Sequence, residues 1–337
     1  MSESKEHHVD EQNAVAALYE EAFGRASILG VCRASPDYAR LLDQVEYRCV
    51  ANAQLNARAY IRASDNRRCV TLNSGCWIVL LQLIDSALEW DVLCQLLPIP
   101  ALGIVRVREL LLGAALDFIV WHEIQHHGNG HVGYFHRRGD PGFAERGNVL
   151  MGRGPTALQM SSMDARACEL WADGQAMNVI WRMHHVWVRD RNCRYYKMRR
   201  HALRNVFVIA AALLFACIAD GEPSMHLYDL GKDAGGHEDE AVASRQYVYP
   251  HPSMRAVYVV KQLASARRLS WLHGDRSGAF RTLAFIKPLE HAKVIPFGLM
   301  LPFSTEGTYL TASSHQILEH WKVIAPRLMP YGLWHLW

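Results

Sequence analysis

The segment that most constrains the fold is residues 104–127, IVRVRELLLGAALDFIVWHEIQHH. Nearly every position from Leu110 to Trp121 is apolar, so a helix built from this segment has no face that suits water. A helix of this kind is buried in the core of a domain. The sequence therefore predicts a buried helix that carries HEIQHH at its carboxyl-terminal end.

His122, Glu123 and His126 in this segment form an HExxH pattern. On a helix His122 and His126 lie one turn apart on the same face, so both imidazoles can bind one Zn²⁺. Zinc with three protein ligands keeps its fourth position for water and lowers the pKa of that water to about 7. Glu123 could then accept a proton from the water. Chance also produces this pattern in a chain with 18 histidines, so the hypothesis depends on a third ligand.

Two nearby candidates for the third ligand fail on geometry. The spacing HExxHxxGxxH requires glycine at 129 and histidine at 132, but the chain has Asn129 and Val132, and His131 is out of register. His127 points about 100° away from His126 around the helix, so it cannot reach the same ion. The third ligand is therefore expected on another element.

The better candidate is Glu169 in ACELWADGQ, on a helix that is expected to begin near Ser161 or Ser162. Glu169 and Asp173 are four residues apart and share one helix face. Glu169 could bind the metal while Asp173 accepts a hydrogen bond from a ligating imidazole. The alternative is that both carboxylates belong to the solvated face of an amphipathic helix.

Composition and charge indicate which partners and which cellular compartment suit the chain. A formal charge of +3, from 36 basic and 33 acidic residues, favours neither nucleic acid nor a membrane surface as a partner of the whole chain. The eight cysteines are scattered and contain no CxxC pair, which indicates free thiols in a reducing compartment. The polar start MSESKEHHVDEQ lacks the features of a secretory signal. A cytoplasmic location is expected.

The remaining pattern predicts mostly helices with a small amount of strand. Residues 11–60 are rich in Ala, Leu and Glu and predict two helices separated near Gly24 and Pro36. Residues 69–72 predict a strand, followed by a turn at 73–75 and a helix. The Gly- and Pro-rich segment 137–156 predicts a long loop.

Residues 206–219, VFVIAAALLFACIA, are an apolar run that allows two interpretations. Fourteen residues of helix span only about 21 Å, less than the roughly 30 Å of a bilayer core. Basic residues precede the run and acidic residues follow it, as at a membrane helix. A buried core helix is preferred, and membrane association stays open.

HExxH followed by ExxAD resembles the gluzincin-like zinc metallopeptidases of the CAAX prenyl protease and heat-shock membrane protease family, and the soluble phage-exclusion Lit peptidase. VTLNSG resembles the edge strand and turn of that family, which implies a substrate-binding role for Asn73 and Gly75. YPHPSMR resembles its later "HP" segment, which implies a role beside the scissile carbonyl for His251, as an oxyanion donor, or for Arg255. A loop or core histidine is an equal alternative for His251. The glycine usual in the family's HExGH is Gln125 here.

These observations predict an α+β, zincin-like protein that is mostly helical, with a small sheet and a buried HExxH helix. Three segments are expected: an N-terminal helical segment (1–64), a metallopeptidase core (65–265) and a C-terminal extension of unknown role (266–337). The expected function is a zinc-dependent endopeptidase acting on an intracellular protein substrate. His122, His126 and Glu169 would bind Zn²⁺, Glu123 would be the general base and Asp173 would orient a ligand.

A function of another class is a zinc-containing module that binds nucleic acid or protein without catalysis. Residues 189–204, RDRNCRYYKMRRHALR, combine seven Arg or Lys residues with two tyrosines, which could contact phosphates and stack on bases. A solvated helix face is the preferred interpretation of this segment. Stoichiometric zinc would favour the enzyme, and metal-independent, salt-sensitive retention of nucleic acid would favour the module.

Overall fold

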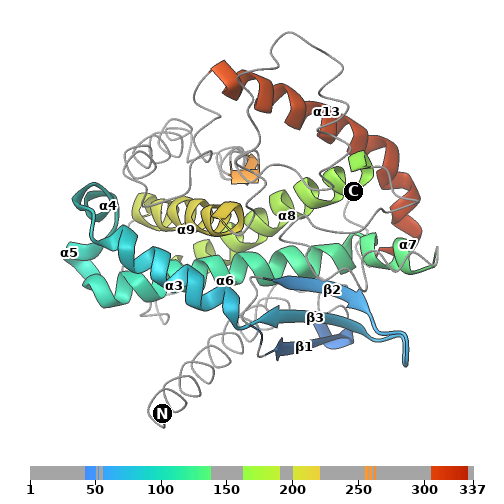
Figure 1. Ribbon diagram of the computed structural model, residues 1–337, viewed down its shortest axis with the longest axis horizontal. Helices are drawn as coiled ribbons and strands as arrows, with labels where there is room; N and C mark the ends of the chain where they lie inside the picture. Colours follow the sequence, from blue (N-terminus) through green and yellow to red (C-terminus); the bar gives the residue numbers. More distant parts are fainter. Residues whose placement is uncertain are drawn as a thin grey trace.

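A computed structural model of the protein describes residues 42–50, 52, 56–137, 162–189, 200–220, 255–256, 258–259, 262 and 305–332. This part of the chain is mostly helical and contains one small mixed sheet (Figure 1). The expected α+β class is confirmed at this level. The helices are α3 (Gly75–Leu88), α4 (Asp91–Leu96), α5 (Ile99–Leu102), α6 (Ile104–Gly128), α7 (His131–Arg137), α8 (Ser162–Arg189), α9 (Arg200–Asp220) and α13 (Thr305–Leu328), followed by the 3₁₀ turn η4 (Met329–Tyr331).

The sheet contains β1 (Val45–Val50), β2 (Ala57–Ile61) and β3 (Arg68–Asn73). Its strand order is β1-β3-β2, with β3 parallel to β1 and antiparallel to β2. The strand expected within residues 69–72 is confirmed as β3. Because β3 lies between the other two strands, the expectation that VTLNSG forms an edge strand is wrong, and β2 is an edge of the described sheet.

The prediction of a helix that ends near residue 60 is wrong for the described residues. Strands β1 and β2 occupy residues 45–50 and 57–61 instead. In β2 the side chains of Ala57, Ala59 and Ile61 are buried and the residues between them are partly exposed. This period of two is typical of a strand with one buried face. The inner face of the sheet packs on α6, and such packing overrides the helix propensity of alanine and leucine.

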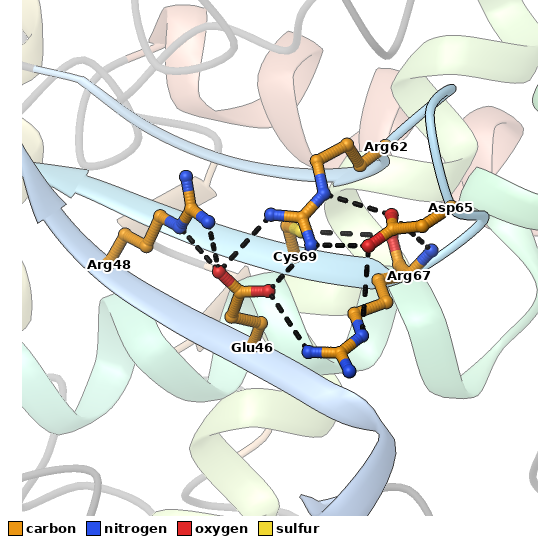
Figure 2. A network of polar contacts seen from close by, with 6 residues as sticks. All are labelled: Glu46, Arg48, Arg62, Asp65, Arg67 and Cys69. Atoms are coloured by element: carbon orange, nitrogen blue, oxygen red, sulfur yellow. Dashed lines mark hydrogen bonds and ion pairs between the residues drawn. The ribbon is translucent and has the colours of Figure 1, made fainter.

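Charged side chains connect β1 to the turn between β2 and β3 (Figure 2). The Arg62 guanidinium donates to Glu46 Oε2 at 2.9 Å and from Nε to Asp65 Oδ1 at 2.9 Å. Arg48 and Arg67 also contact Glu46. The hydrogen bond with Arg62 is the main cause that lowers the pKa of Asp65 to about 2. Exposed ion pairs contribute little stability each, so the network mainly fixes the register of β1 beside the hairpin.

The turn expected at residues 73–75 joins β3 to α3, as predicted. Its backbone amides are held by the segment before β2: Asn73 N–H donates to Asn56 O at 2.9 Å and Gly75 N–H donates to Asn52 O at 2.7 Å. Asn73 and Gly75 are both buried. The sheet is thereby fixed to the helical part of the molecule.

Helix α6 is the centre of the fold, as its apolar sequence predicts. It lies between the sheet and α8, and it also contacts α3 and α9 (Figure 1). Every residue from Ala114 to Gly130 is buried. The HExxH residues therefore lie in a dry environment, where charges interact more strongly than in water.

Helices α8 and α9 are also where the sequence predicts them. Helix α8 begins at Ser162 and packs along α6. In α9, residues 206–215 are all buried, and the helix contacts α6 and α3. None of the helices in the described ranges is both long enough and apolar enough for a membrane span. The core-helix interpretation of residues 206–215 is thus confirmed by their burial.

The C-terminal part of the described chain returns to the end of α6. Helix α13 packs along α8, and the turn that follows it contacts the loop between α6 and α7. Gly130 has φ of +81°, and a Cβ atom there would lie 2.4 Å from Leu328 O and 2.6 Å from Gly332 N. A side chain at this position would displace backbone, so glycine permits both the turn and the close contact.

Candidate metal centre

Helices α6 and α8 bring together the three residues that the sequence predicts as metal ligands. One ligand atom from each of His122, His126 and Glu169 lies within 4.8 Å of the others. The Nε2 atoms of the two histidines are 3.0 Å apart, and they lie 3.2 and 3.3 Å from the oxygens of Glu169. All three side chains are buried. The solvated-face alternative for Glu169 and Asp173 is therefore wrong, because both are fully buried and face α6.

Asp173 lies behind His122, one helix turn after Glu169. Its Oδ1 atom is 2.9 Å from His122 Nδ1, on the side of the ring opposite Glu169. Burial alone would lower the pKa of His122, but the interactions with Asp173 and Glu169 outweigh it and raise the pKa to about 10. The surroundings of the His122 ring thus favour a positive charge beside Glu169. A metal cation would supply that charge in place of the proton.

Glu123 is buried next to this cluster on α6. Neither of its carboxylate oxygens has a hydrogen bond of normal geometry within the described chain. Burial is the main cause that raises the pKa of Glu123 to about 7, while the charge of His122 opposes this shift. The backbone amide of Ala59 in β2 also favours the charged form. A carboxyl group with a pKa near neutrality suits both accepting and returning a proton.

Arg255 is buried and pairs with the carboxylates of α8. Its Nε and Nη2 atoms donate to Asp173 at 2.7 and 2.8 Å, and Nη2 lies 3.5 Å from Glu169 Oε2. The guanidinium also lies over the ring of Phe215, 5.2 Å from its centroid. Asp173 and Glu169 hold the pKa of Arg255 above its usual value despite burial. Arg255 therefore fixes Asp173, and through it the ring of His122.

The three candidate ligands could hold a metal ion, and their chemistry is compatible with zinc. Both Glu169 oxygens are buried without a hydrogen bond of good geometry, and burial lowers the pKa of the adjacent His126 well below its usual value. A buried carboxylate beside a neutral imidazole is stabilised by a cation. Two histidines and one glutamate are a known catalytic zinc set that leaves one position open. The residues present thus fit the expected group.

Other predicted site residues lie elsewhere. Asn73 and Gly75 lie in the β3–α3 turn, where their amides bond to the fold itself. His251 lies outside the described residues, as does the segment 137–156 apart from Arg137. Among the described residues that the sequence places near substrate, Arg255 lies beside the three candidate ligands and Asn73 and Gly75 are held in the fold.

Sequence reasoning did not anticipate two neighbours of the cluster. His127 donates from Nε2 to Cys69 O at 3.0 Å and so joins α6 to β3. His131 is buried with its Nδ1 atom 2.8 Å from His126 Nδ1. Helical register turns His127 away from the candidate ligands, His131 contacts the far side of the His126 ring, and neither belongs to the three candidate ligands. The turn signal Gly128-Asn129-Gly130 could have indicated that the chain folds back toward His126.

Comparison with known proteins adds no relative to these observations: no family model, curated protein or solved structure matches the chain. The assignment therefore depends on the geometry of α6 and α8 and on the sequence motifs.

Proposed function

We propose that the protein is a zinc-dependent endopeptidase of zincin-like fold. The observation that carries the proposal is the convergence of His122, His126 and Glu169 from two helices, with Glu123 buried beside them. The resemblance of HExxH and ExxAD to gluzincin-like peptidases supports the same reaction. Hydrolysis of a peptide bond needs an activated water, a base and a proton donor to the leaving amine. A zinc ion held by the three ligands would activate the water, and Glu123 would serve as base and then as proton donor.

When bound, zinc supplies a water of lowered pKa and polarises the scissile carbonyl. Glu123 accepts the proton of the attacking water and then delivers it to the leaving nitrogen. Burial is the main cause that raises the pKa of Glu123 in the metal-free protein, which favours return of the proton to the leaving group. Asp173 accepts the Nδ1 proton of His122, which leaves Nε2 free as a ligand. Arg255 keeps Asp173 charged and in place.

The free edge of β2 is a suitable place for the substrate backbone. Within the described sheet, β2 pairs on one side only, and its Ala59 amide lies near Glu123. An extended peptide that adds to this edge would place its backbone beside the general base. The sequence resemblance assigned pairing with the substrate backbone to β3. We assign it instead to β2, which is an edge of the described sheet. A protein or peptide substrate in the cytoplasm stays the expectation.

The alternative binding module is not favoured by any observation on the described residues. Most of its basic segment, residues 190–199, lies outside them. A module of that kind would not require a buried glutamate beside two histidines and a second glutamate. The endopeptidase therefore accounts for more of the described geometry.

The decisive experiment is the substitution Glu123→Gln in the full-length protein. It removes the base and keeps the size and polarity of the side chain. Zinc content should stay stoichiometric, and the rate of cleavage should fall by about 10²- to 10⁴-fold. Zinc is measured by elemental analysis, and cleavage by proteome-wide mapping of new N-termini after incubation with the purified protein.

Glu109→Gln is the matched control, because Glu109 lies on the same helix but is exposed and pairs with Arg106. It should change neither zinc content nor cleavage. Unchanged cleavage in Glu123→Gln would exclude Glu123 as the base, and absence of zinc from the wild-type protein would exclude the metal centre.

A further inference from the structure

His131 occupies a special position behind one of the proposed ligands. It is the first residue of α7, directly after the turn at Gly130, and its side chain is fully buried. Its Nδ1 atom lies 2.8 Å from His126 Nδ1, and the two rings meet edge to face with centroids 5.0 Å apart. The contact is on the side of His126 opposite the cluster, since Nε2 of His126 faces His122 and Glu169.

This geometry links the protonation patterns of the two rings. Both rings are fully buried and their Nδ1 atoms face each other at hydrogen-bond distance, so one Nδ1 must donate and the other must accept. A neutral imidazole carries one proton, and binding a metal through Nε2 requires that proton to be on Nδ1. The 2.8 Å contact then requires His131 to accept the proton at its own Nδ1 and to carry its hydrogen on Nε2. The reverse arrangement would leave His126 with a proton on the ligating nitrogen.

The C-terminal helix holds the ring of His131 in place. Trp321 on α13 meets His131 edge to face, with centroids 5.4 Å apart and an angle of 73° between the ring planes. Trp321 in turn stacks on Trp171 of α8, at 4.7 Å and 13°. Trp171 lies between Glu169 and Asp173 in the sequence. Trp321 of α13 thus lies between the ring of His131 and Trp171 of α8. Helix α8, which supplies Glu169, supports the His131 ring through this tryptophan.

We propose that His131 is a positioning residue of the metal centre, which accepts the Nδ1 proton of His126 and so selects the tautomer that binds metal. The inference rests on the proposed zinc site and adds a partner for its second histidine, as Asp173 is for the first. It also gives the C-terminal segment a role, because Trp321 forms the wall against which His131 is held. A hydrogen-bond partner of this kind typically contributes 10- to 100-fold to metal affinity.

The test compares His131→Phe with His131→Asn in the full-length protein. Phenylalanine keeps a ring against Trp321 but removes the acceptor, whereas asparagine keeps an acceptor near the position of Nδ1. Zinc affinity, measured by competition with a chromophoric chelator, should weaken by about 10- to 100-fold in His131→Phe. It should recover most of the way in His131→Asn. The visible absorption bands of the Co²⁺-substituted protein should shift in His131→Phe and return toward wild type in His131→Asn.

His127→Phe is the matched control. His127 is equally buried and lies on the same helix, but it donates to Cys69 O and not to a ligand. This variant should lower the unfolding temperature and leave both zinc affinity and the Co²⁺ bands unchanged. Equal zinc affinity in His131→Phe and wild type would overturn the role of His131 while the zinc site stands. A wild-type protein that binds no zinc would overturn both.

A measurement on the zinc-loaded wild-type protein makes the test independent of folding of the variants. In protein labelled with ¹⁵N-histidine, long-range ¹H–¹⁵N correlations report which ring nitrogen carries the proton. His131 is expected to be neutral with its proton on Nε2. A proton on Nδ1 of His131 would contradict the inference directly.

Discussion

Around the candidate metal centre, burial of charged groups determines how much each residue contributes to folding stability and to metal binding. Glu169 and Asp173 are both fully buried beside one guanidinium, that of Arg255. Loss of one partner in such a group leaves another charge buried without compensation, which destabilises the fold more than loss of an exposed pair. Arg255 bonds to Asp173 through two hydrogen bonds and reaches Glu169 only at 3.5 Å. Glu169 can therefore be removed while the Arg255–Asp173 pair remains.

Glu169→Ala should accordingly abolish stoichiometric zinc binding and leave a folded protein. The physical reason is that the ion loses its only proposed carboxylate ligand, whereas Arg255 keeps both hydrogen bonds to Asp173. The measurement is zinc content by elemental analysis, with circular dichroism to monitor folding. Asp164→Ala on the same helix is the control, because Asp164 pairs with His320 and not with the cluster. Full zinc retention in Glu169→Ala would exclude Glu169 as a ligand.

The sequence predicts the three candidate ligands that the structure brings together, because their spacing within each helix follows from local helix geometry. Residues four apart on a helix share a face in any fold, so both the HExxH pair and the Glu169–Asp173 pair can be recognised before the structure is known. His131 could not be placed in this way. Its contact with His126 depends on a reversal of the chain at Gly130, where helical periodicity no longer applies.

At the scale of elements, long apolar patterns predict four helices, α3, α6, α8 and α9. No comparable pattern predicts the strands β1 and β2. The two strands are six and five residues long, and they lie in a stretch of sequence whose alanine, leucine and glutamate content is typical of helices. Their strand conformation depends on pairing with β3, which is a contact between segments separated in sequence. The pairing crosses residue 64, the predicted end of an N-terminal segment.

The junction between the end of α6 and the turn after α13 can be tested with two glycines. Gly130 and Gly103 both have φ of +81°, but a Cβ atom would meet backbone atoms at 2.4 Å at Gly130 and nothing within 4 Å at Gly103. Gly103→Ala should therefore cost only the strain of an unfavourable backbone conformation, about 1–3 kcal/mol. Gly130→Ala should cost more, because the C-terminal turn must also move.

Urea unfolding followed by circular dichroism gives both free energies of unfolding. The Gly130 variant should also bind zinc more weakly, since Gly130 directly precedes His131. Equal destabilisation by the two substitutions would show that the contact with Leu328 and Gly332 contributes nothing.

At the scale of the whole molecule, stability is expected to decrease from α6 toward the outer strand. Helix α6 contacts α3, α8, α9 and two strands, whereas β1 pairs only with β3 within the described sheet and has partly or fully exposed side chains at most positions. Amides at the centre of a fold exchange with solvent only on global unfolding, and those at an edge exchange through local opening.

Hydrogen exchange measured by mass spectrometry should therefore show the slowest amides in residues 107–127 and faster exchange in residues 45–50. Zinc should slow the exchange of α6 further, because a ligand that binds only the folded state raises the free energy of global unfolding. It should have little effect on β1, whose local opening does not release the metal. Uniform slowing of both segments would contradict this separation.

The contact of Gly130 with the turn after α13 also has a consequence for biosynthesis. Leu328 lies roughly 200 residues after Gly130 in the chain, which corresponds to about 10–40 s of translation at 5–20 residues per second. Helix α6 is made before that interval begins and α8 early in it, so the three candidate ligands can meet before α13 exists. During this time Trp321 is absent, and His131 is not yet held against His126. A ribosome-bound chain that stops before residue 321 should therefore capture zinc more weakly than the released protein, which means that completion of synthesis also completes the metal centre.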